Sequence, residues 1–449
     1  MQLAYLELFE GHQAQALRQF NNLVSADPTD REALQGNARM AYYRGDLAYA
    51  HNLTASLVDD DPRDVSTLLL QARLERALHR KRQAWALIGR TESFDPGNAE
   101  ARELENSLRD DSRPTLHTSA SFAREIASGN ASSAEDLSTF GYENTWGFAA
   151  LPRSESYLSL AYLPSQSPSG GIQGAVGPSQ ILYHQTTYVT SFLTLRSGVG
   201  LVRFGPGELA GIPTQQQPIT SAGIRPLGFG SLSYALSNKL TADFGVARNA
   251  ITYTPVAARL GVMEDRISLG LDYRFNAKTS FRLEPFANED STASHGHALN
   301  LGGSSSTVST RSDRNRGAGA SLTFNRKLFH KSALAVDLGY DGLAYGFSGS
   351  GLRPYLGFFN PSFFQRHYLT THVVGKIHGP LGFDFASGVG VQQVERGTPL
   401  RLAMLVSPAL TLKASHRLTL SLGYTHYNSS QSLGTLRGDA VRLTTDWKF

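Results

Sequence analysis

The chain ends on VRLTTDWKF, residues 441–449, and the spacing of apolar residues in this stretch decides how the C-terminal part folds. Alternation with period two predicts a β-strand, because successive side chains of a strand point to opposite faces. One face carries Phe449, Trp447, Thr445, Leu443 and Val441, and the other carries Lys448, Asp446, Thr444 and Arg442. A strand with one apolar face, one charged face and a terminal aromatic residue is expected in a barrel with lipid outside and water inside. Trp447 and Phe449 are then the candidate signal for barrel assembly.

The same alternation appears upstream, from about residue 114 onward. In RISLGLDYRF (266–275) the apolar residues and the charged residues fall on opposite sides, and RLTLSLGYTHY (417–427) and LTADFGVA (240–247) repeat the pattern. Period two over such lengths indicates strands with two unlike faces.

The connections between these stretches alternate in length. Short polar turns are expected at 151–154, 237–239, 276–278, 378–380 and 415–417, and long loops rich in Gly, Ser and Pro at 165–178, 206–221, 288–314, 346–364 and 428–436. Short turns at one end and long loops at the other are typical of outer-membrane barrels. Strands are expected to begin near 114, 136, 155, 179, 194, 222, 239, 264, 278, 315, 332, 365, 381, 400, 417 and 437. Sixteen strands close a barrel without an unpaired edge in lipid; a soluble β-sandwich or propeller is the alternative.

Composition agrees with a folded protein of two unlike parts. Residues 1–110 hold 13 Lys and Arg and 17 Asp and Glu, so 30 of 110 are charged, against 50 of the remaining 339 (80 − 30). No stretch reaches the roughly 18 consecutive apolar residues of a membrane helix. The chain has no Cys, which suits an envelope protein. The excess of positive charge is spread out, so no nucleic-acid partner is expected.

The N-terminal part repeats at intervals of 34 residues. Asp-Pro recurs at 27–28, 61–62 and 95–96, and Ala at 16, 50 and 84. This pattern resembles the tetratricopeptide repeat, in which pairs of antiparallel helices stack into a solenoid. His79 stands where the repeat has Gly at 11 and 45. We expect three repeats and a cap helix at 98–109.

The start of the chain lies inside the first predicted helix, and MQLAYLELFEGH lacks the pattern of a signal peptide. We therefore expect further repeats and a signal peptide upstream; a self-contained domain of three repeats is the alternative. Arg76, Arg80, Lys81 and Arg82 are a candidate basic patch for a partner, or an ordinary solvated helix face.

The sequence thus predicts a tetratricopeptide-repeat α-solenoid over residues 1–112 and a closed antiparallel transmembrane β-barrel of about 16 strands over residues 113–449. Repeats followed by such a barrel resemble bacterial exopolysaccharide exporters. GLRPYLGFFNPSFFQRHYL (351–369) resembles a segment of the cellulose synthase operon protein C family: Gly357, Phe358, Phe359 and Pro361 occupy matching positions. Asn360 stands where that family usually has Ser, and Leu356 where more Gly is expected. The resemblance covers about residues 315–449.

That resemblance implies export of a β-glucan, most directly cellulose, across the outer membrane, with the repeats in the periplasm docking the synthase machinery or other periplasmic proteins. The alternation places a set of charged residues toward the pore: Arg266, Asp272, Arg274, Arg282, Glu284, Arg442, Asp446 and Lys448. These residues either contact the polysaccharide or pair with one another. The rings of Phe358, Phe359, Phe363 and Phe364 are expected in an outer loop, as a gate or as loop packing.

Motifs for catalysis are missing from the sequence. It contains no Walker phosphate loop, H-E-x-x-H or G-x-S-x-G. His295 and His297 lie among Ser, Gly and Asn, and we expect a solvated loop rather than a metal site. We therefore expect no enzyme activity, cofactor or metal. The alternatives are a porin for another polymer such as poly-N-acetylglucosamine, a barrel-anchored docking or adhesion protein, and a barrel hydrolase or deacylase.

Overall fold

The structure is a computed structural model, and its described residues form a helical unit and a barrel unit. The structure describes residues 1–10, 12–127, 136–149, 153–166, 172–173, 177–204, 208–209, 223–252, 257–258, 261–291, 314–331, 333–348, 361–428 and 436–449. The expected residues Gly357, Phe358, Phe359, His295 and His297 lie outside these ranges.

The helical unit is the expected stack of tetratricopeptide repeats. Its described residues form seven helices: α1 (Gln2–Phe9), α2 (Gln13–Ala26), α3 (Arg31–Tyr43), α4 (Leu47–Asp60), α5 (Val65–Ala77), α6 (Lys81–Phe94) and α7 (Ala99–Asp111). The repeated alanines Ala16, Ala50 and Ala84 are fully buried. A small residue at each of these positions lets two helices approach closely. Among the described residues, no helix is long and apolar enough to cross a membrane.

The Asp-Pro positions explain why each repeat turns where it does. The Asp27 carboxylate accepts the backbone N–H of Thr29 at 2.9 Å, and the Asp61 carboxylate accepts that of Arg63 at 3.0 Å. Such Asx turns end the preceding helix without a helical continuation. Three residues after each Asp, a side-chain oxygen of Asp30, Asp64 or Asn98 accepts a backbone N–H at the start of the next helix. Each of these caps stabilises its helix by about 1 kcal/mol.

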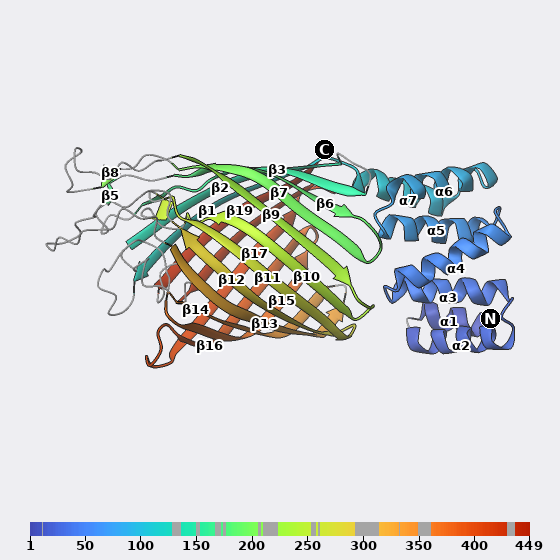
Figure 1. Cartoon of the computed structure of the whole chain (residues 1–449). Coiled ribbons are helices and arrows are strands. Elements are labelled where there is room, and N and C mark those ends of the chain that lie inside the picture. Colours follow the sequence, from blue (N-terminus) through green and yellow to red (C-terminus); the bar gives the residue numbers. More distant parts are fainter. Residues whose placement is uncertain are drawn as a thin grey trace. The chain divides into compact units, whose positions relative to one another are not determined.

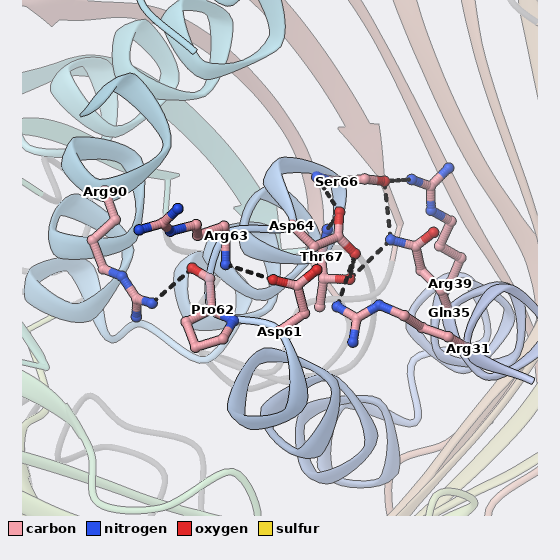
Figure 2. Close-up of polar contacts among 10 residues, drawn as sticks. All are labelled: Arg31, Gln35, Arg39, Asp61, Pro62, Arg63, Asp64, Ser66, Thr67 and Arg90. Carbon is pink, nitrogen blue, oxygen red and sulfur yellow. Dashed lines mark hydrogen bonds and ion pairs between the residues drawn. The ribbon is translucent and has the colours of Figure 1, made fainter. Parts of the chain in front are cut away.

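A polar network joins successive repeats, as Figure 2 shows. The guanidinium of Arg31 contacts the carboxylate of Asp64 at 3.0 Å, and Thr67 Oγ1 donates to the same carboxylate at 2.5 Å. Arg39 donates to Ser66 Oγ at 2.8 Å. Because these partners lie on α3 and on the turn and first residues of α5, the network sets how one repeat stacks on the next.

The repeated glycine position has a left-handed backbone. Gly45 has φ +79°, and His79, at the matching position of the next repeat, has φ +55°. A left-handed conformation costs a residue with a Cβ roughly 1–2 kcal/mol. The turn geometry therefore persists in the third repeat although its glycine is absent.

Two glycine substitutions are expected to change stability in opposite directions. Nothing lies within 4 Å of a Cβ built on Gly45 or on Gly89, so neither Ala meets a clash. Gly45→Ala should destabilise the repeats by about 1–2 kcal/mol through its positive φ, whereas Gly89→Ala, within α6, should stabilise them by about 0.5–1 kcal/mol. Denaturant unfolding followed by helical circular dichroism measures both. Equal effects of the two changes would contradict the assignment of the left-handed turn.

The repeats are expected to lose stability in acid. Burial raises the pKa of Asp64, but hydrogen bonds from Thr67 and Arg31 outweigh burial and hold it below the ordinary 3.8. A carboxyl whose pKa is lowered by folding contributes stability above its unfolded pKa and loses it as pH falls through the folded pKa. During acid titration, the helical circular dichroism signal of the repeats should therefore decrease below about pH 4. Asp64→Asn should reduce this dependence, and an unchanged acid transition would show that Asp64 does not contribute.

The barrel unit contains the 16 long strands that the alternation predicts, within the described residues. They are β1 (Thr115–Ala127), β2 (Asp136–Phe148), β3 (Ser154–Tyr162), β6 (Ser179–Tyr188), β7 (Leu193–Arg203), β9 (Ile224–Ala235), β10 (Leu240–Ala250), β11 (Met263–Asn276), β12 (Thr279–Ser291), β13 (Arg314–Lys331), β14 (Leu334–Phe347), β15 (Phe364–His378), β16 (Leu381–Gln393), β17 (Arg401–Lys413), β18 (Leu418–Tyr427) and β19 (Leu436–Lys448). Each begins within two residues of the expected position. Short pieces add to these: β4 (Ser165–Gln166) pairs with β2, and β5 (Ile172–Gln173) pairs with β8 (Glu208–Leu209).

The first and last strands pair and close the sheet. β1 and β19 run antiparallel over 13 residue pairs, from Thr115↔Lys448 to Ala127↔Leu436. Figure 1 shows the tilted strands of this barrel with β1 beside β19. VRLTTDWKF is therefore the closing edge of the barrel, as its alternation predicts.

Connections in the barrel alternate in length. Two residues join β11 to β12 and two join β15 to β16, whereas β12 and β13 are 22 residues apart (292–313). We call the end with short connections the turn end and the opposite end the loop end. The expected loop at 288–314 starts too early, because β12 continues to Ser291 and pairs with β13 there.

Candidate functional site

The barrel has an apolar outer face. Along β11, Ile267, Leu269, Leu271, Tyr273 and Phe275 are all exposed, and the residues that alternate with them are polar or glycine. The same alternation surrounds the barrel and leaves large apolar side chains exposed on strand after strand. They include Phe140, Leu160, Leu201, Leu232, Phe244, Leu369, Leu402, Leu410, Leu422 and Leu443. A continuous exposed apolar surface of this kind suits contact with lipid.

The polar face is the concave one, which lines the lumen. Arg282 on β12 contacts Asp243 on β10 at 2.8 Å, past the intervening strand β11. Side chains of strands that are not neighbours converge only on the inside of a curved sheet. The alternation of β11 and β12 therefore places Arg266, Asp272, Arg274, Arg282 and Glu284 on the lumen face.

Arg282 is the centre of an ion-pair cluster in the lumen. Besides Asp243, its guanidinium lies 3.0 Å from the Glu284 carboxylate and 3.6 Å from the Asp272 carboxylate. Arg266 contacts Glu284 at 3.2 Å and also stacks over the ring of Phe286, 3.9 Å from its centroid. Two arginines and three carboxylates give the cluster a net charge of −1.

A glycine makes this cluster possible. A Cβ on Gly270 would lie 2.8 Å from Arg282 Nη2 and 3.2 Å from Asp243 Oδ2. Gly270 faces the lumen on β11 between the two partners, and its missing side chain leaves the space through which they meet.

At the turn end, the lumen carries histidine–aspartate pairs. Expected residue Asp446 accepts a hydrogen bond from His117 across the β1–β19 closure, at 2.7 Å. His330 pairs with Asp337 at 2.8 Å, and His372 pairs with Asp384 at 3.0 Å. By the alternation of β19, expected residues Arg442 and Lys448 share the lumen face with Asp446. The outward alternate positions hold Trp447 and Phe449, whose rings lie 4.6 Å apart.

At the loop end, lumen-facing side chains are buried. They come from strands on all sides of the barrel: Glu125, Leu137, Val202, Leu227, Asp290, Asn315, Phe347, Phe364, Gln392 and Ala403. By contrast, His117 and Asp446 at the turn end are 42% and 57% exposed. The lumen therefore has buried side chains at its loop end and exposed ones at its turn end.

Aromatic residues form part of that layer. The ring of Tyr345 lies 5.2 Å from the ring of Phe364, 6.2 Å from that of Phe347 and 6.5 Å from that of Phe286. A Cβ on Gly319 would come within 2.4 Å of Tyr345 Cβ and 2.7 Å of Phe286 Cζ. As at Gly270, a lumen-facing glycine lets side chains of its two neighbouring strands meet.

Two residues that were expected in the outer loop, Pro361 and Phe364, are buried in the structure. Phe364 is the first residue of β15 and fully buried, so its assignment to an outer loop is wrong. Pro361 is buried just before β15, and its carbonyl accepts the N–H of Phe347 at 2.9 Å. Sequence reasoning missed Asp243 and His117, because it could not give the strand register that brings them to their partners.

The expected basic patch of the repeats is partly neutralised, because two of its four residues pair with carboxylates. Arg76 contacts Asp111 at 2.6 Å, and Lys81 donates to the Asp111 carbonyl at 2.5 Å. Arg80 lies 3.4 Å from the buried carboxylate of Glu75 and 3.1 Å from His51 Nε2. These contacts tie α5, α6 and α7 together, so three of the four expected residues have structural partners.

No protein family and no curated protein matches this sequence. Among solved structures, the chain is similar to one described as a bacterial polysaccharide outer membrane secretin, with 10% identity and a TM-score of 0.54, covering 75% of this chain and 99% of that one. It is also similar to the Arabidopsis OM64 TPR domain (15% identity, TM-score 0.23, 24% of this chain and 89% of that one) and to Pseudomonas aeruginosa OccK11 (14% identity, TM-score 0.35, 76% and 96%). The first likeness shows the fold: the barrel resembles that of an outer-membrane protein.

Removing Arg282 is expected to change the ion selectivity of the lumen. Arg282→Gln leaves three carboxylates with one arginine, so the cluster's net charge goes from −1 to −2 (+1 − 3). One unit charge changes the energy of an ion about 4 Å away by about 1 kcal/mol in water, so selectivity should shift toward cations. Reversal potentials across planar bilayers measure this shift. Arg316→Gln, which removes an outward-facing arginine, is the control, and equal selectivity of parent and Arg282→Gln would contradict the assigned lumen position.

Proposed function

We propose that this chain is an outer-membrane porin that exports a bacterial exopolysaccharide. The observation that carries the proposal is a closed barrel of 16 strands with a polar lumen and an apolar outer face. Barrels of about 16 strands are wide enough to enclose an aqueous channel. The likeness to a protein described as a polysaccharide secretin supports the same reading of the fold.

The chemistry of the lumen favours an uncharged, polyhydroxylated chain. Its charges are largely paired, as around Arg282, so no single sign dominates. Elsewhere the lumen-facing hydroxyls contact one another across strands: Ser407 with Thr425 at 2.8 Å, and Thr411 with Ser421 at 3.2 Å. Such hydroxyls can exchange hydrogen bonds with those of a passing sugar. Cellulose is the first candidate because residues 351–369 resemble the cellulose exporters, and poly-N-acetylglucosamine is the alternative.

We further propose that the chain acts without catalysis, since passage of a finished polymer needs no bond to form or break. The tetratricopeptide repeats belong to a fold class that binds proteins. We propose that they lie in the periplasm and dock the synthase machinery or another periplasmic protein. A barrel that serves only as an anchor for the repeats in docking or adhesion is the competing function.

Current through the purified protein in planar bilayers tests this proposal. Cello-oligosaccharides on the turn-end side should block the current transiently, and longer chains should block it for longer because they contact more of the lumen. Equal blocks by charged and uncharged oligosaccharides, or no current at all, would contradict the proposal. Blocks by N-acetylglucosamine oligomers alone would favour the alternative polymer.

Two tryptophan substitutions on β16 provide a matched test of the route. Ala386 faces the lumen, opposite His372 and Ser407, whereas Val389 on the same strand faces outward and is 54% exposed. Ala386→Trp should reduce current and oligosaccharide block because the indole takes up lumen space. Val389→Trp should leave both unchanged, because a large apolar side chain suits the lipid-facing surface. Equal effects would place the transport path outside this lumen.

A further inference from the structure

A row of charged side chains crosses the outer face of the barrel near the loop end. Strand pairing aligns Gly228 with Arg248, Arg248 with Asp265, Asp265 with Glu289, and Glu289 with Arg316. All five lie at outward positions, in phase with the exposed Val246 and Ile267. The apolar outer face therefore ends in a charged border on β10 to β13.

Arg314, the next outward residue on β13 toward the loop end, adds to this border and shares one carboxylate with Arg316. Arg316 Nε lies 2.7 Å from one Glu289 oxygen, and Arg314 Nη1 lies 3.4 Å from the other. The arginine side chains are 76% and 64% exposed, whereas Glu289 is 25% exposed. Arg248 and Asp265 form a separate, balanced pair at 3.5 Å. The border therefore has one positive charge in excess, on two accessible guanidinium groups.

A hollow with a mainly apolar lining reaches from the charged border toward the turn end. It has a volume of about 950 Å³; its lining includes Gly228, Gly230, Val246, Ile267 and Ala287, together with Arg248, Asp265, Glu289 and Arg316 of the border. The small residues make it: a Cβ on Gly230 would meet only Val246, at 3.7 Å. An open apolar groove beside an excess positive charge matches a molecule with an apolar chain and an anionic head.

We infer that this surface binds a phosphorylated lipid of the loop-side leaflet, with its phosphate at Arg314 and Arg316 and an acyl chain in the hollow. Guanidinium groups bind phosphate through paired, charge-assisted hydrogen bonds. The charged border also lies where an apolar barrel face gives way to polar groups, which is the depth of lipid headgroups. The inference goes beyond the proposed function and depends only on its membrane location. It requires no transport through the lumen.

Titration of the purified full chain in detergent with lipid A, a phosphorylated glycolipid of bacterial outer leaflets, tests the inference. Binding is measured by native mass spectrometry. The double variant Arg314→Gln, Arg316→Gln should bind lipid A at least about tenfold more weakly, a loss of about 1.4 kcal/mol. Lipid A without its phosphates should bind the parent protein as weakly as intact lipid A binds the double variant. Arg437→Gln, an outward-facing change at the loop end of β19, is the matched control and should bind like the parent.

Filling the hollow separates a lipid from a free anion. Ala287→Trp places an indole in the hollow without removing a charge, so it should weaken lipid A binding and leave any binding of inorganic phosphate unchanged. Undiminished lipid A binding by the double arginine variant, or by Ala287→Trp, would overturn the inference. Binding is measured without current, so a failure of the porin proposal in bilayers and a failure of this inference are separate results.

Discussion

The structure of the barrel depends on the pairing of its first and last strands. In lipid, every backbone N–H and C=O must find a partner within the protein, because an unsatisfied group costs several kcal/mol. A sheet with free edges cannot meet that requirement, and the 13 residue pairs between β1 and β19 remove the edges. The pairing also fixes which face is which. A slip of one residue would exchange the lumen and lipid faces of β19, placing Arg442 and Asp446 in lipid.

In the closed barrel, two lumen-facing glycines determine which side chains of non-adjacent strands can touch. Strands carry lumen-facing side chains at every second position, and a side chain on a middle strand separates its neighbours. Gly270 removes that barrier between Asp243 and Arg282, and Gly319 removes it between Phe286 and Tyr345. The first contact balances charge in the middle of the lumen, whereas the second packs rings at the loop end. Gly270 thus allows an ion pair that partly neutralises the lumen, and Gly319 allows part of the ring packing at the loop end.

Much of the fold could be predicted from sequence, since period-two alternation and turn composition are local signals. They placed the strand starts within two residues, and the 34-residue recurrence of Asp-Pro predicted the helical repeats. The partners within the site could not be predicted, because they depend on register between strands far apart in sequence, as for His117 and Asp446. Phe364 was assigned to the loop because the strand was expected to begin near residue 365, whereas β15 begins one residue earlier. In the repeats, the charge of Arg76 was visible in the sequence, but its neutralisation by Asp111, 35 residues later, depends on helix stacking.

The most direct test of the closed barrel is disulfide formation between β1 and β19, which the absence of native Cys makes unambiguous. Ala123 and Ala440 are paired in the register, and both face the lumen. The Ala123→Cys, Ala440→Cys variant should form an intramolecular disulfide in membranes. The pair Ala123→Cys, Thr444→Cys should not, because four residues along a strand add about 13 Å, beyond the reach of a disulfide. Absence of the first cross-link, or equal formation of both, would contradict the closure on which this account depends.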